Sequence, residues 1–178
     1  MSRQPRSWTC QRRISAKAKT ERCITERAGD HDDIAWLRGC AADHAADWHL
    51  ADFVRKGDVV LCFYPLAFTG VCSKEMKCVN DEMNRWAAKG ATVVGVSCDS
   101  FAANKAWADQ MGLKQTLLSD MHRQVCQAYG LYWAELNVSS RGTVVIGQSD
   151  SGHGTVKWIE SRQPGNAMDW DKVLAQIA

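Results

Sequence analysis

Residues 58–72 read DVVLCFYPLAFTGVC, and this stretch decides the fold. Its first part, 58–64, is almost continuously apolar and rich in β-branched and aromatic residues, which is typical of a strand buried on both faces. Pro65 then fixes the entry to a loop, and Thr69 stands where it can cap a helix that begins at residue 70. The pattern therefore predicts a strand, a short loop and a helix with Cys72 in its first turn.

A thiol in the first turn of a helix is a candidate nucleophile. The free N–H groups of that turn and the positive end of the helix dipole favour a thiolate at Cys72, and the hydroxyl of Thr69 can be offered to the same sulfur. A lone cysteine in an apolar setting is more often inert. The cap, the proline and the position between strand and helix together favour a reactive Cys72.

The rest of the chain alternates strand-like and helix-like blocks. A short helical turn is expected at 48–53, before the first strand. After Cys72 we expect a helix over 70–89, a strand over 91–97, a helix ending at Gly112, a short strand at 117–118, a helix over 121–129, a hairpin of 143–146 with 155–159, and a helix over 169–177. This order indicates an α/β sandwich of thioredoxin-like order, with a central mixed β-sheet flanked by helices.

Charge is distributed unevenly along the 178 residues. The net charge is +2, but residues 1–28 carry eight Lys or Arg against two Glu. We therefore expect a basic, poorly patterned extension over 1–44 and one domain over 45–178. The extension is open to several interpretations: an organelle transit peptide, a nucleic-acid-binding arm, a solvated segment or a misassigned translation start. The solvated or misassigned segment is favoured over the other two, so we expect no nucleic-acid partner.

Composition also limits the class of protein. No stretch approaches the roughly 18 apolar residues that a membrane span needs, and no secretory signal is recognisable, so we expect a cytoplasmic protein without a membrane partner. Eight cysteines are present without any C-x-x-C pair, and the five histidines show no ligand spacing. We therefore expect neither a disulfide framework nor a metal or other cofactor.

Residues 63–72, FYPLAFTGVC, resemble the peroxiredoxin active-site motif P-x-x-x-T-x-x-C. Three further blocks agree with this family in the same order: 97–108, 117–130 and 140–143. The sequences PLAFTGVC and RGT are most similar to those of the one-cysteine, alkyl hydroperoxide reductase E-like branch. The resemblance implies a thioredoxin-like fold and an enzyme that reduces hydrogen peroxide and organic hydroperoxides.

The resemblance also implies a role for each matching residue. Cys72 would be the peroxidatic nucleophile, which attacks the peroxide and becomes a sulfenic acid. Thr69 would hydrogen-bond the thiolate and the peroxide, and Arg141 would hold positive charge beside the sulfur. Pro65 would shield the pocket, and Glu75 would orient the arginine.

How the sulfenic acid is reduced stays open at this point. Cys78 lies six residues after Cys72, about 9 Å along the helix axis and about 240° around it, too far for a disulfide without unwinding. Cys98 and Cys126 are further candidate resolving cysteines. We favour an external redoxin or low-molecular-weight thiol as reductant, and the resemblance implies a homodimer.

Two other classes of protein remain as alternatives. One is a non-enzymatic thioredoxin-like binding or holdase module with structural cysteines, which would have no need of Thr69, Cys72 and Arg141 together. The other is a general disulfide oxidoreductase, which the missing C-x-x-C pair disfavours.

Overall fold

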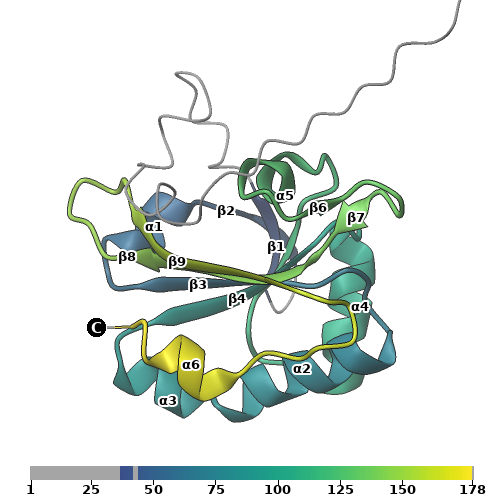
Figure 1. Ribbon diagram of the computed structural model, residues 1–178, viewed down its shortest axis with the longest axis horizontal. Coiled ribbons are helices and arrows are strands. Elements are labelled where there is room, and N and C mark those ends of the chain that lie inside the picture. The colour runs from purple at the N-terminus through teal and green to yellow at the C-terminus, as the bar shows by residue number, and fades with distance from the viewer. Residues whose placement is uncertain (1–36, 42–43, 178) are drawn as a thin grey trace, which may run out of the picture.

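The computed structural model describes residues 37–41 and 44–177. In these residues seven strands form one mixed sheet, in the order β2-β1-β5-β4-β3-β8-β9 (Figure 1). Strands β3, β4 and β5 are parallel, and the remaining neighbours pair antiparallel. The strands are β1 (Leu37–Ala41), β2 (His44–Trp48), β3 (Val59–Phe63), β4 (Thr92–Ser97), β5 (Leu117–Ser119), β8 (Arg141–Gly147) and β9 (Thr155–Arg162); β6 (Tyr132–Trp133) and β7 (Val138–Ser139) form a separate pair.

Helices cover both faces of this sheet (Figure 1). Helices α2 (Gly70–Asp81), α3 (Met83–Ala88), α4 (Phe101–Met111) and α6 (Trp170–Leu174) lie on one face, and α1 (Leu50–Val54) and α5 (Gln124–Ala128) lie on the other. Among the described residues, no helix is both long enough and apolar enough to span a membrane.

The alternation of side chains along β3 divides the interior into two cores. Val60 and Cys62 point into the core shared with α2, α3, α4 and α6, whereas Leu61 and Phe63 point into the core shared with α1 and α5. All five residues of β3 are buried, as its apolar sequence predicts. The expected α/β sandwich with a central mixed sheet is therefore confirmed.

The expected helix over 70–89 is interrupted at Glu82, so that α2 and α3 are separate. Glu82 has φ −92° and ψ 7°, outside the helical region. Asn80 and Asp81 precede it, and such side chains compete with the backbone for hydrogen bonds inside helices. The side chain of Asn80 indeed accepts the N–H of Lys114, at 2.9 Å.

The N-terminal part of the sheet was not expected. Strand β1 pairs with both β2 and β5, so the described sheet begins at Leu37, upstream of the boundary expected at residue 45. The expectation for the basic extension falls mostly on residues 1–36, which lie outside the described residues.

Candidate active site

Helix α2 positions Cys72 in its first turn, where the side chain is 2 % exposed. Thr69 occupies the N-cap position, but its hydroxyl donates to the carbonyl of Leu66 at 2.9 Å and makes no cap bond to the helix. The preceding Phe68 has φ 61°, a left-handed conformation that turns the loop at this point. The first-turn N–H groups of α2 are thus left without the cap bond that the sequence predicts.

Arg141, the first residue of β8, provides a cation beside the sulfur of Cys72. Its Nη2 donates to Cys72 Sγ at 3.2 Å, its Nη1 donates to Glu75, and its Nε donates to the carbonyl of Pro164 at 2.9 Å. The guanidinium is buried and 1 % exposed. Because the group is planar, three bonds in three directions fix the Nη2–H that faces the sulfur.

Glu75 lies one turn after Cys72 on α2 and is buried with two arginines. Besides Arg141, its carboxylate accepts from Arg162 Nη2 at 2.9 Å and from the backbone N–H of Met168 at 3.0 Å. Arg162 is the last residue of β9, directly opposite Arg141 in the antiparallel register. Sequence reasoning missed Arg162, because the expected hairpin ended at residue 159.

Glu160 and Lys172 extend this group of charges towards the surface. Glu160 accepts from Arg162 at 3.2 Å and from Lys172. Partial burial would raise the pKa of Glu160, but hydrogen bonds from Lys172 and Arg162 outweigh burial and lower it. The carboxylate of Glu160 is therefore assigned as ionised.

The buried part of this group contains two arginines around one carboxylate. Arg141 and Arg162 are 1 % and 8 % exposed and share the carboxylate of Glu75, whereas Glu160 and Lys172, 21 % and 51 % exposed, lie nearer the surface. Cys72 Sγ accepts a hydrogen bond from Arg141, so a buried cation faces the sulfur. Electropositive surroundings of this kind are typical of reactive cysteines.

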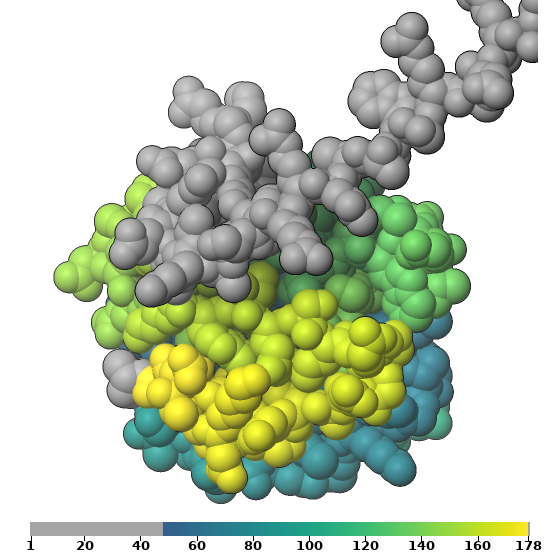
Figure 2. All heavy atoms as spheres, viewed as in Figure 1, coloured from purple at the N-terminus to yellow at the C-terminus, as the bar shows by residue number. Residues whose placement is uncertain are grey.

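The C-terminal segment covers this group from outside. Figure 2 shows the yellow C-terminal residues lying across this face beside the blue-green residues of α2 and α3. The contacts agree, since Met168 bonds Glu75, Arg85 bonds Asp171, and Trp86 packs edge-on against Trp170. The segment between β9 and α6 therefore separates Glu75 from solvent.

The loop between β3 and α2 is held from the side of β4. The carboxylate of Asp99 accepts the N–H of Ala67 at 2.9 Å and the hydroxyl of Ser97 at 3.0 Å. Pro65 is buried at the start of the loop, and the ring of Phe68 lies 6.2 Å from that of Trp107. Asp99 is thus tied to this loop, while the neighbouring Ser100 caps α4 by accepting the N–H of Ala103.

Comparison with known proteins places this geometry in a family. A model described as "AhpC/TSA family" matches residues 38–158. The chain belongs to the AhpC/TSA family. Alkyl hydroperoxide reductase E of Mycobacterium tuberculosis is 34 % identical over 125 residues, which are 67 % of this chain and 79 % of that protein. A chloroplastic 2-Cys peroxiredoxin of Hordeum vulgare is 28 % identical over 141 residues, 70 % of this chain and 67 % of that protein.

The fold of this AhpC/TSA chain is also similar to that of a solved structure. The crystal structure of the reduced 2-Cys peroxiredoxin of Plasmodium vivax superposes with a TM-score of 0.70 and 26 % identity, over 78 % of this chain and 73 % of that one. The expected resemblance to peroxiredoxins and the thioredoxin-like fold are therefore confirmed. The names of the relatives are those of peroxidases, which agrees with the expected enzyme class.

The structure of this AhpC/TSA member does not bring the candidate resolving cysteines to Cys72. Cys78 is exposed on α2, and Cys126 is buried in the core on the opposite face of the sheet. Cys62 shares the core with Cys72, but burial, and next the negative charge of Glu75, raises the pKa of the Cys62 thiol. Cys62 is therefore held as an unreactive thiol.

Proposed function

We propose that the chain is a thiol-dependent peroxidase that reduces hydrogen peroxide and organic hydroperoxides through Cys72. The observation that carries the proposal is the guanidinium of Arg141, which is 1 % exposed and donates to Cys72 Sγ at 3.2 Å. Catalytic cysteines lie in electropositive surroundings of this kind, and the nucleophilic form of cysteine is the thiolate. A binding module with structural cysteines has no use for this costly arrangement.

In the proposed reaction the Cys72 thiolate attacks the terminal oxygen of the hydroperoxide. The S–O bond forms as the O–O bond breaks, the sulfur is oxidised to a sulfenic acid, and the leaving alkoxide or hydroxide takes a proton to become an alcohol or water. Arg141 stabilises the negative charge that moves onto the oxygens, and Glu75 positions Arg141. Thr69 binds the peroxide after its hydroxyl turns from the carbonyl of Leu66, and Pro65 shields the sulfur from bulk water.

We further propose that an external thiol or redoxin reduces the sulfenic acid. A thiol attacks Cys72 Sγ, the S–O bond breaks, water leaves, and a second thiol then releases Cys72 from the mixed disulfide. The positions of Cys78 on the outer side of α2 and of Cys126 beyond the sheet support this one-cysteine cycle. An internal partner would require helix α2 to unwind or a segment to cross the sheet.

The test compares Cys72→Ser with the matched variant Cys78→Ser in peroxide consumption with excess dithiothreitol. We expect most of the activity to be lost in the first, apart from any slower reaction at other peroxide-sensitive thiols, and little change in the second. Peptide mapping after one equivalent of peroxide separates the two cycles, since added oxygen on the peptide of Cys72 indicates an external reductant and a disulfide from that peptide to another indicates an internal partner. Full activity of the Cys72→Ser chain would refute the proposal.

The assembly and location of the chain are proposed from its relatives. We propose a homodimer, which light scattering on the purified chain tests through its mass. We propose a cytoplasmic location; the chloroplastic name of the barley relative and the basic residues before position 28 make organelle import the alternative. Fusion of residues 1–44 to a fluorescent protein distinguishes the two.

A further inference from the structure

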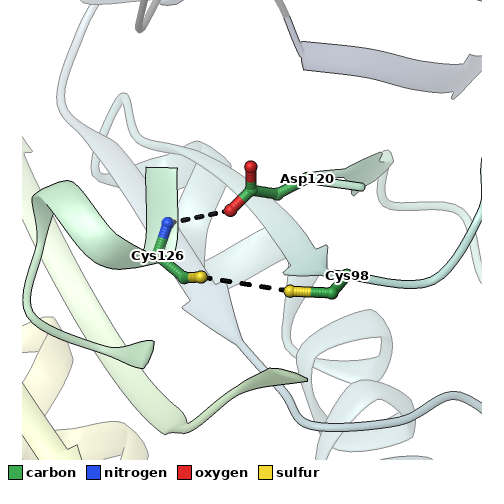
Figure 3. A group of neighbouring side chains, drawn as sticks. All are labelled: Cys98, Asp120 and Cys126. Carbon is green, nitrogen blue, oxygen red and sulfur yellow. Dashed lines mark hydrogen bonds between the residues drawn. The ribbon is translucent and has the colours of Figure 1, made fainter. Parts of the chain in front are cut away.

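Two cysteines that the Cys72 chemistry does not use face each other on the opposite side of the sheet. Cys98 follows the last residue of β4, and Cys126 lies in α5. Their sulfur atoms are 3.9 Å apart, and Figure 3 shows the two side chains pointing towards each other beside Asp120. A disulfide needs a separation of about 2 Å, so the sulfurs must approach by roughly a further 2 Å.

Asp120 fixes the backbone that carries Cys126. Its Oδ2 accepts the N–H of Cys126 at 2.8 Å and its Oδ1 accepts the N–H of Val125 at 3.2 Å. Asp120 itself is 4 % exposed, directly after β5. Cys98 and Asp120 follow the neighbouring parallel strands β4 and β5, and Asp120 holds the start of α5, which carries Cys126. The two sulfurs are therefore held close together.

The two thiols have unequal environments. Cys98 is half-buried, whereas Cys126 is completely buried. The hydrogen bond from Cys126 lowers the pKa of Cys98 despite its partial burial, and the same bond together with burial raises the pKa of Cys126. The geometry and the charges thus favour a nucleophile at the accessible position and a protonated partner behind it.

We infer that Cys98 and Cys126 form a second redox-active dithiol, which hydroperoxides convert to a reversible intramolecular disulfide separate from the Cys72 site. The carboxylate of Asp120 lies within 4.8 Å of both sulfurs, as a metal ligand would. Both of its oxygens already accept backbone N–H groups, and the sulfurs share a hydrogen bond, so the dithiol is the form that the contacts favour.

Each step of the reaction balances. The Cys98 thiolate attacks the hydroperoxide, so that an S–O bond forms, the O–O bond breaks and an alcohol or water leaves after taking a proton. The sulfur of Cys126 then attacks Cys98 Sγ; the S–S bond forms, the S–O bond breaks, and the thiol proton of Cys126 leaves with the hydroxide as water. One hydroperoxide is reduced for each disulfide, and an added dithiol restores both cysteines.

The inference takes hydroperoxide as oxidant from the proposed function but makes no use of Cys72, so the test uses the full chain with Cys72→Ser. The protein is treated with a chelator, exposed to hydrogen peroxide, alkylated and digested with trypsin. Cys98 and Cys126 fall in the separate tryptic peptides 90–105 and 124–141, each with one cysteine. We expect these peptides to be joined, at a mass two hydrogens below their sum, and to separate on reduction.

Tryptic mapping of the chain with native Cys72 is the control for a folding defect of the Cys72→Ser variant. We expect the joined peptides in that chain too. Adding Cys98→Ser should leave Cys126 alkylated as a free thiol, while adding Cys126→Ser should leave Cys98 as a sulfenic acid that reacts with dimedone. The inference is overturned if both peptides remain alkylated after peroxide, if either cysteine joins another chain, or if stoichiometric zinc is found on the untreated protein and protects both thiols. Loss of peroxidase activity with Cys72→Ser tests the proposed function separately.

Discussion

Replacing Arg141 by alanine should slow the reaction of Cys72 with hydrogen peroxide by about 100- to 1000-fold. The guanidinium lies 3.2 Å from Cys72 Sγ, and at an effective dielectric constant of about 20 the attraction between unit charges at this distance is about 5 kcal/mol. That value is an upper limit, because the guanidinium also interacts with Glu75 and because water would fill the space that Arg141 leaves. Loss of one preorganised donor to a developing charge typically raises the barrier by about 3–4 kcal/mol, which corresponds to the expected decrease.

The assay is stopped-flow tryptophan fluorescence of the reduced chain mixed with excess hydrogen peroxide, across a series of pH values. In Arg141→Ala the rate constant should be lower at every pH value, because the donor that stabilises the charge moving onto the peroxide oxygens is lost. Arg141→Lys keeps the charge but cannot donate to Cys72, Glu75 and Pro164 together, so we expect an intermediate rate constant. Arg85→Ala is the matched control, since this arginine is exposed and pairs with Glu82 and Asp171.

Stability must be measured alongside the rate. Removing one partner of a buried ion pair commonly destabilises a protein by about 3–5 kcal/mol, and Arg162 remains with Glu75 to limit that loss. Urea unfolding followed by circular dichroism shows whether the Arg141→Ala chain is folded at the temperature of the assay. A folded Arg141→Ala chain whose rate constant is within threefold of the unmodified value would refute the charge argument.

Three further predictions test the surroundings of the site. Asp99→Ala should lower the peroxide rate constant about tenfold, because the Ala67 N–H loses a bond to a charged acceptor that contributes about 1.5 kcal/mol; an unchanged stopped-flow rate would contradict this. Cys62→Ala should leave that rate constant within twofold and destabilise the fold by about 1 kcal/mol in urea unfolding, since a buried thiol with a raised pKa takes no part; a large drop in rate with the fold intact would reassign it. Because the folded pKa of Glu160 is lowered from 4.5, its stabilisation is complete above that pH and disappears as pH falls through the folded value. Glu160→Gln should therefore unfold more easily than the unmodified chain at pH 7, by up to about 1 kcal/mol, and the difference should shrink as the pH falls below 4.5; a difference that stays constant down to pH 3 would contradict the lowered pKa of Glu160.

The sequence predicts those parts of the fold that depend on local pattern. Strand β3 and the start of α2 follow from the apolar run at 58–64 and the Pro65 to Thr69 loop, and Gly112 ends α4 with φ 65° as expected. Strands β1 and β2 escape prediction because residues 37–48 are rich in alanine and aspartate and lack the period of a strand. They become strands only because β5 offers an edge to β1.

Some residues of the candidate site can be identified from the sequence motif, whereas one depends on the pairing of strands. Cys72, Thr69 and Pro65 lie in one motif, and Arg141 and Glu75 were identified through the family resemblance. Arg162 could not be identified in this way, because its relation to Glu75 arises from the pairing of β8 with β9, which sets it opposite Arg141. The sequence signal for Arg162 is an arginine at the position of the hairpin that lies opposite Arg141.

The central sheet gives the two groups of thiols different environments. Cys72 lies against α2 and the buried charges, whereas Cys98 and Cys126 lie where β4 ends beneath α5. Because the two groups pack into cores on opposite faces of the sheet, we expect a reductant to reach each of them from a different face. The rate of reduction at each position should then respond to surface substitutions on its own face of the sheet and not to those on the other face.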